Sequence, residues 1–185
     1  MGNKTTGDGN ISSGRDTFIN QIEATKNDYG VIEIMFEFVL KKIEDNDDTD
    51  TKSSTTRDKL IHIKDKIELN FKTQVERSEV KEYFTKLYTK INFVEKAFQS
   101  LDTEEQNDVH FYILNNYNSL KRNDDETSPI EILTELAHGF IPENQLQNPT
   151  YKSIAHAIIL FFFDDCTIFE KTSKEPIFPN LFDGL

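Results

Sequence analysis

Apolar residues recur every three or four positions from Ser78 to Cys166, and clear helix caps separate the repeating stretches. This spacing places apolar side chains along one side of a helix, so each stretch is typical of an amphipathic helix that packs into a core. The clearest stretch spans residues 78–101. A chain of 185 residues can build one real core, because a domain of this size hides roughly 70% of its unfolded surface. The sequence therefore predicts an all-α fold, a single helical-bundle domain of about five or six helices.

Three helix starts are marked by side chains that accept hydrogen bonds from the first backbone N–H groups. Residues 128–131 read Ser-Pro-Ile-Glu, which combines a capping box with proline at the first helical position. Residues 148–149 read Asn-Pro and repeat the cap-and-proline arrangement, while Asp102 with Glu105 is an acidic variant of the capping box. The helix that follows Pro149 is apolar almost all round, so we expect it to be central.

The composition divides the chain into three parts. Residues 1–28 form a polar, turn-rich extension, which is either an unstructured tail or short strands that pair with another chain. Residues 29–173 form the helical domain, in which 45–56 is predicted to be a flexible loop and 57–71 to start as a helix and end extended. Residues 174–185 form an extended apolar tail, because two prolines spaced three apart prevent a long helix.

The charge balance argues against nucleic acid as a direct partner. The chain has 21 Lys and Arg against 33 Asp and Glu, a formal net charge of −12, which repels a phosphate backbone. Five lysines are the candidates for a basic patch, but each has acidic neighbours, so we predict that they lie on solvated faces: Lys41, Lys42, Lys59, Lys64 and Lys66. An acidic protein of this kind suits a basic protein partner better.

The apolar run 157–163 is much shorter than the ~20 residues that a membrane-spanning helix needs. The single cysteine is compatible with a reducing compartment. We therefore expect a cytoplasmic protein with no membrane partner.

Motifs for common catalytic and cofactor chemistry are missing from the sequence. There is no phosphate-binding Gly-Lys-Ser/Thr loop, no dinucleotide fingerprint and no Gly-x-Ser-x-Gly nucleophile elbow. The four histidines are far apart, and Glu135 with His138 supplies only one of the two Glu-x-x-His motifs that a di-iron bundle needs. We expect neither a metal nor a cofactor, and our main hypothesis is that the protein is not an enzyme.

One short segment resembles a catalytic motif. Residues 57–62, Arg-Asp-Lys-Leu-Ile-His, resemble the Arg, polar residue, three residues, His signature of the all-helical HEPN-type ribonucleases. The resemblance implies metal-independent RNA cleavage, with His62 as general acid and base and Arg57 stabilising the charged phosphate. Family members often have glycine after the histidine, where this chain has Ile63. An endoribonuclease is therefore the alternative hypothesis.

Three other segments resemble the small helical accessory subunits of bacterial conflict systems, of the ABC-three-component and Lamassu-like kind. They are the Gly-Asp-Gly-Asn and Gly-Arg-Asp turns within 7–16, Lys-Ile-Glu-Leu-Asn-Phe at 66–71, and Phe-Phe-Asp-Asp-Cys-Thr-Ile-Phe-Glu at 162–170. The resemblance implies a scaffolding or regulatory role in an antiviral defence complex, beside an SMC-like ATPase and an effector subunit. It implies no catalytic residues.

Our main hypothesis is thus a protein-interaction or regulatory subunit that binds its partners through terminal segments. Apolar side chains outside the core can be buried in a partner as anchors. The expected anchors are Ile11, Phe18 and Ile19 near the N-terminus and Phe178, Leu181 and Phe182 near the C-terminus. Two alternatives stay open: the C-terminal tail packs across its own domain, or the protein is an acidic mimic that inhibits a nucleic-acid-binding protein.

Overall fold

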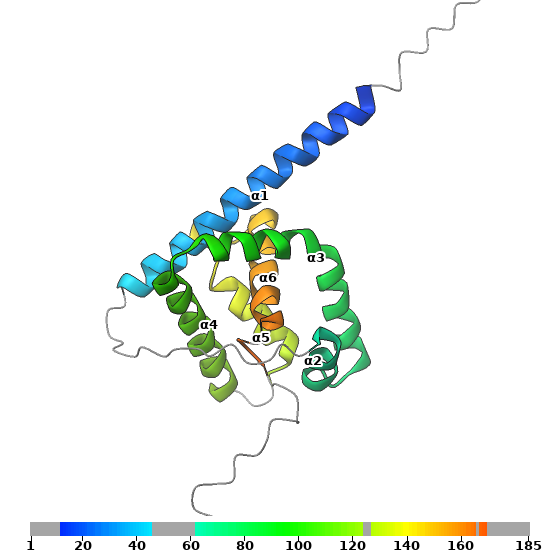
Figure 1. Ribbon diagram of the computed structural model, residues 1–185. Coiled ribbons are helices and arrows are strands. Elements are labelled where there is room, and N and C mark those ends of the chain that lie inside the picture. Colours follow the sequence, from blue (N-terminus) through cyan, green and yellow to red (C-terminus); the bar gives the residue numbers. More distant parts are fainter. Residues whose placement is uncertain (1–11, 46–61, 124–126, 166, 170–185) are drawn as a thin grey trace, which may run out of the picture.

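The computed structural model describes residues 12–45, 62–123, 127–165 and 167–169, with the side chains of the first range described from Asn27 onward. These residues form six α-helices and one 3-10 turn, without a β-strand (Figure 1). The predicted all-α fold is confirmed. The elements are α1 Ser12–Asp45, α2 Ile63–Asn70, α3 Gln74–Ser100, α4 Thr103–Asn123, α5 Pro129–His138, η1 Glu143–Gln145 and α6 Pro149–Asp164.

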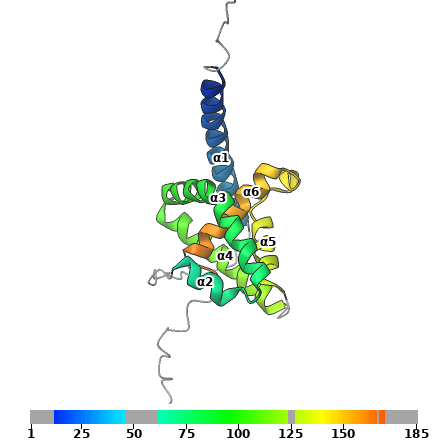
Figure 2. The same ribbon diagram turned by 90° about the vertical axis from the view of Figure 1, so that its right-hand side faces the viewer.

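Helix α6 lies at the centre of the core, as its all-round apolar sequence predicts. It contacts α3, α5 and α1, which surround it in Figures 1 and 2. Burying each of its large apolar side chains contributes about 1.5–3 kcal/mol. The buried residues of α6 are Ile154, Ala155, Ala157, Ile158, Ile159, Leu160, Phe162 and Phe163.

A cluster of aromatic rings around Phe98 joins four of the helices. The Phe98 ring centroid lies 5.9 Å from that of Phe36 on α1, 5.1 Å from that of His110 on α4 and 5.1 Å from that of Phe162 on α6. The rings of His110 and Phe162 meet Phe98 edge to face, the arrangement that ring quadrupoles favour. This cluster holds α3 against the rest of the core.

The predicted helix starts at Asp102, Ser128 and Asn148 are confirmed by hydrogen bonds. The Glu131 N–H donates to the Ser128 hydroxyl, and the Thr150 N–H donates to the side-chain oxygen of Asn148. Helix α3 differs, because it starts at Gln74 instead of near residue 78. An unpredicted capping box of Thr73 and Glu76 sets this start, and in it each side chain accepts a hydrogen bond from the other residue's N–H.

Helix α1 starts at Ser12, so residues 12–28 are helical and not the turn-rich extension that the sequence predicted. The alternative of short strands is wrong for these residues, because a strand pair needs further partners whereas a helix closes its hydrogen bonds locally. The C-terminal half of α1 buries Ile32, Phe36 and Val39 against α3, α4 and α6. Its N-terminal half extends beyond the other helices in both views (Figures 1 and 2).

The short helix α2 ends at Asn70, and Phe71 is extended with φ −107° and ψ 110°. This confirms the predicted helix with an extended end for the described part of 57–71. The segment 167–169 returns to the same place, because the ring of Phe169 lies 5.8 Å from that of Phe71 and 5.1 Å from that of Tyr117. Phe169 has a φ of 68°, which is uncommon for a residue with a side chain. Its aromatic contacts offset that cost.

Candidate functional site

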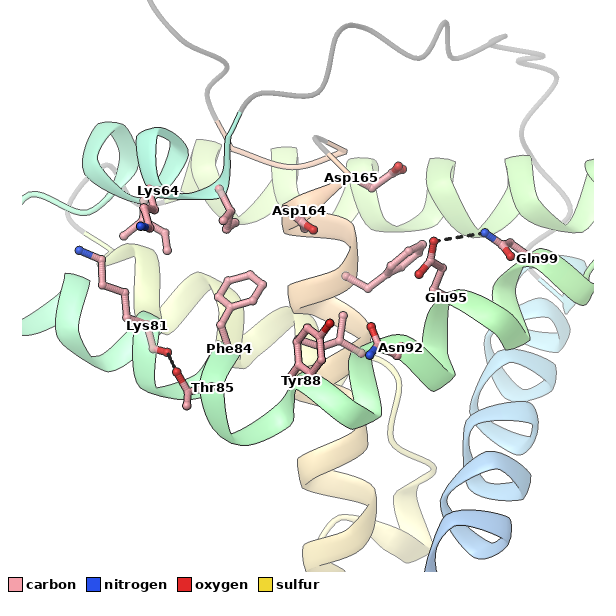
Figure 3. A pocket seen from close by; sticks show the side chains of 14 residues that line it. Lys64, Lys81, Phe84, Thr85, Tyr88, Asn92, Glu95, Gln99, Asp164 and Asp165 are labelled. Atoms are coloured by element: carbon pink, nitrogen blue, oxygen red, sulfur yellow. Dashed lines mark hydrogen bonds between the residues drawn. The ribbon is translucent and has the colours of Figure 1, made fainter.

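A groove lies between α2, the middle of α3 and the C-terminal end of α6 (Figure 3). Its volume is about 810 Å³, which falls within the ~300–1,000 Å³ of typical ligand pockets. The lining residues are Ile63, Lys64 and Ile67 from α2, Lys81, Phe84, Thr85, Tyr88, Ile91, Asn92, Glu95 and Gln99 from α3, and Phe161, Asp164 and Asp165 from the end of α6.

Helix α3 supplies an apolar stripe to the groove. Phe84, Tyr88 and Ile91 are three or four residues apart, so they share one face of the helix. Tyr88 is 66% exposed, and Figure 3 shows its ring and that of Phe84 pointing into the groove. The Thr85 hydroxyl donates a hydrogen bond of 2.9 Å to the Lys81 carbonyl. Bonds of this kind often bend helices, and α3 bends along its length in Figure 1.

The two ends of the groove carry opposite charges (Figure 3). Lys64 and Lys81 lie at one end, and Glu95 and Asp165 lie at the other. The Lys81 ammonium is 3.0 Å from the Glu68 carboxylate, which offsets the positive charge of that end. The acidic end therefore dominates the charge of the groove.

The carboxyl of Asp164 lies on the wall of the groove. Loss of solvent around its carboxyl raises the pKa of Asp164, and the positive charge of Lys66 opposes this. The charges of Asp165 and Glu95 raise that pKa further, with a smaller opposing effect of His62. A further positive charge near Asp164 would favour the ionised form of its carboxyl, as that of Lys66 does.

The buried Lys66 joins α2 to the end of α6. Lys66 is 0% exposed, and its ammonium donates a hydrogen bond to the Phe163 carbonyl and lies 4.6 Å from the centroid of the Phe163 ring. The last carbonyls of a helix lack partners within the helix and attract cations. The expectation that Lys66 lies on a solvated face is therefore wrong, because it caps α6 and fixes one wall of the groove.

A Thr-His-Asp grouping at the end of α6 holds the chain in place and does not form a catalytic relay. His110 Nδ1 is 2.9 Å from the Thr167 hydroxyl, within hydrogen-bond distance. The Asp165 carboxylate is 3.8 Å from His110 Nε2, too far for the hydrogen bond that orients a catalytic histidine. The His110 ring also packs against Phe98 and Phe162, so we assign it to the packing of α4 against α3, α6 and Thr167.

The terminal anchors expected from the sequence fall on different parts of the chain. Phe18 and Ile19 belong to the projecting N-terminal half of α1, where only the backbone is described. Ile11 and the C-terminal anchors lie outside the described residues; the latter are Phe178, Leu181 and Phe182. The described residues that line the groove therefore include none of the expected anchors.

The residues of the ribonuclease-like motif are not brought together in the described part of the chain. His62 caps the N-terminus of α2, where its Nδ1 accepts a hydrogen bond of 3.3 Å from the Lys64 N–H. Arg57 lies outside the described residues. In the described ranges, His, Cys, Asp and Glu side chains form no group of three that could hold a metal ion.

The sequence analysis singled out no groove residue as functional. Phe84 and Ile91 have the spacing of core residues, so nothing in the pattern separates them from the core. Tyr88 shares the helix face of Phe84 and Ile91, so no signal in the sequence sets its exposed ring apart from them. Among the described residues, no helix combines the length and the apolar character that crossing a bilayer requires.

Comparison with known proteins gives one family match. A family model described as C-terminal domain 10 of the ABC-three component (ABC-3C) systems matches residues 36–170. This range starts within α1 and includes the whole groove. No curated protein and no solved structure matches the chain.

Proposed function

The chain belongs to the family of C-terminal domain 10 of the ABC-three component (ABC-3C) systems, and we propose that it is a non-enzymatic interaction and regulatory subunit of a multiprotein complex. Family membership confirms the resemblance to these systems that the sequence suggested. A component of a multicomponent system has other proteins as its partners. The finer proposal is that the complex acts in antiviral defence in the cytoplasm and contains an SMC-like ATPase and an effector.

The projecting half of α1 is the observation that carries this proposal. Helix α1 has 34 residues and is therefore about 51 Å long. Among its side chains that are described, from Asn27 onward, the buried ones begin at Val31. In proteins, most of the stability of a helix comes from packing its apolar face on other elements. A helix that leaves the domain in this way is best explained by packing on another chain, which would bury Phe18 and Ile19.

The proposed mechanism is docking that restrains the activity of a partner. The terminal anchors bind: Ile11, Phe18 and Ile19 on one side, and Phe178, Leu181 and Phe182 on the other. We keep the proposed division of the chain, in which residues 29–173 form the folded domain and 174–185 lie beyond it. The family match at 36–170 falls inside the bounds of that domain.

Co-expression with the products of the neighbouring genes tests the proposal. The full chain is expected to co-purify with at least one of them. The double variant Phe18→Asp with Ile19→Asp, or deletion of residues 174–185, is expected to lower the recovered partner at least tenfold with an unchanged melting temperature. Asn20→Asp with Gln21→Asp is the matched control, because it adds the same charge to the same helix and should retain the partner.

Three outcomes would contradict the proposal. If the deletion of 174–185 unfolds the domain, the tail belongs to the core and is not a docking segment. Metal-independent RNA cleavage that both Arg57→Ala and His62→Ala abolish, with helicity retained, would establish the ribonuclease alternative. If raising the salt concentration dissociates the partner equally from the unchanged protein and from the anchor variants, the acidic mimic would be favoured.

A further inference from the structure

The groove between α2, α3 and α6 has features of a binding site that the proposed function does not use. We propose that it docks a short segment of a protein partner that presents two or more apolar side chains followed by a Lys or Arg. The apolar side chains would cover Tyr88 and Phe84, and the basic residue would lie at the end formed by Glu95, Asp164 and Asp165. This inference rests on the proposed role in a multiprotein complex and adds a second contact surface to it.

The apolar part of the groove supplies the affinity. Tyr88 is 66% exposed, although large aromatic residues contribute most to an interface when a partner covers them. Phe84, Ile91 and Phe161 are partly buried and pack against the core beside it. A partner that covers Tyr88 therefore extends an apolar surface that the fold already holds in place.

The charges of the groove select the partner. Three carboxylates, those of Glu95, Asp164 and Asp165, line the acidic end of the groove. Loss of solvent raises the pKa of Asp164 most, and the charges of Asp165 and Glu95 raise it further. At the opposite end Glu68 already pairs with Lys81 and lies 2.6 Å from Arg77. A basic side chain at the acidic end relieves the repulsion, whereas an acidic one adds to it.

The dimensions favour a segment of chain over a whole helix or a second domain. From Lys81 to Gln99 the groove follows roughly 27 Å of α3, which an extended segment of about eight residues spans. Because α3 bends (Figure 1), a straight helix would lie along only part of it. The volume of about 810 Å³ accommodates a few side chains only.

A display library of random 12-residue peptides is the probe for this proposal. Peptides are selected on the full chain and then measured as synthetic peptides by fluorescence polarisation. The selected peptides are expected to share apolar residues followed by Lys or Arg, and Tyr88→Lys should weaken them at least tenfold. Val75→Lys is the matched control, because Val75 is a 74% exposed apolar residue of the same helix outside the groove. It should leave binding unchanged.

Charge reversal tests the acidic end separately. Glu95→Lys is expected to weaken the basic peptides at least tenfold but to leave versions with Gln in place of Lys or Arg unaffected. Glu104→Lys, at an exposed position of α4, makes the same change outside the groove and should have no effect. Changing Glu95 and the basic peptide residue singly and together measures the interaction energy between these two groups.

Several results would overturn the proposal. If the selected peptides bind Tyr88→Lys and the unchanged protein with equal affinity, the site lies elsewhere. Enrichment of acidic peptides would contradict the charge argument. If deletion of residues 174–185 strengthens peptide binding tenfold, the tail of this chain is the occupant. A dimer that Tyr88→Lys dissociates identifies a second copy instead. Phe18→Asp with Ile19→Asp should not alter peptide binding, so failure of the terminal anchors and failure of the groove are distinguishable.

Discussion

Replacing the buried Lys66 tests whether one charge joins α2 to the core. The ammonium donates to the Phe163 carbonyl, lies over the Phe163 ring and opposes the raised pKa of Asp164. Lys66→Met keeps most of the apolar stem and removes the charge. The variant leaves the end of α6 without this donor and Asp164 without this neighbouring cation.

The expected loss follows from opposing terms. A hydrogen bond from a charged donor is worth about 1.5–3 kcal/mol, and a cation at a helix C-terminus adds about 0.3–1 kcal/mol. Lys66→Met also removes the desolvation cost of burying an ammonium, and this gain in stability offsets part of the loss. We expect the free energy of unfolding to fall by about 2 kcal/mol in Lys66→Met. Lys66→Ala also removes three methylenes at about 0.8 kcal/mol each, so the total is about 4 kcal/mol.

Urea unfolding and thermal melting measure both variants. A loss of about 2 kcal/mol corresponds to a melting temperature about 4–8 °C lower for a chain of this size. Lys64→Met is the matched control, because Lys64 is exposed on the same helix, and it should change stability by less than about 0.5 kcal/mol. Equal or greater stability of Lys66→Met would show that the desolvation cost of the ammonium exceeds the contribution of its contacts.

Three other predictions concern the core, a helix cap and pH. Phe98→Ala should lower the free energy of unfolding in urea by about 3–5 kcal/mol, because it leaves a cavity among four helices; a loss below about 1 kcal/mol would contradict the packing described. Ser128→Ala should cost about 1 kcal/mol through loss of the α5 cap, whereas Ser119→Ala on the exposed side of α4 should cost nothing; equal effects would argue against the cap. The pKa of Asp164 is raised above its ordinary 3.8, so the native state binds the carboxyl proton more tightly than the unfolded chain does. The unchanged protein should therefore lose stability relative to Asp164→Asn as the pH rises from below 3.8 through the raised pKa. A difference that stays constant with pH would refute this.

The sequence predicted the helix starts whose capping residues lie within a few positions of one another. The caps at Ser128 and Asn148 hold because donor and acceptor are neighbours in the chain. The start of α3 was not predicted, although its capping box at Thr73 is equally local. The N-terminal half of α1 was mistaken for turns because Gly14 and the polar residues around it weaken the apolar period.

Long-range features were not predictable from the pattern. Lys66 is buried because it reaches the carbonyl of Phe163, a residue 97 positions away, and no local signal marks such a pair. The groove likewise forms only when α2, α3 and the end of α6 meet. Tyr88 differs from Phe84 and Ile91 only in its greater exposure, which depends on the neighbours that the fold supplies.

The native mass of the protein in extracts of its own cells tests the central claim most directly. The claim is that this helical domain works as one component of a larger protein assembly. The chain alone has a mass of 21.5 kDa, so size exclusion with light scattering on gently isolated, tagged protein should give a much larger mass that includes other proteins. A monomer of 21.5 kDa with no associated protein, in cells where the neighbouring genes are expressed, would contradict the account.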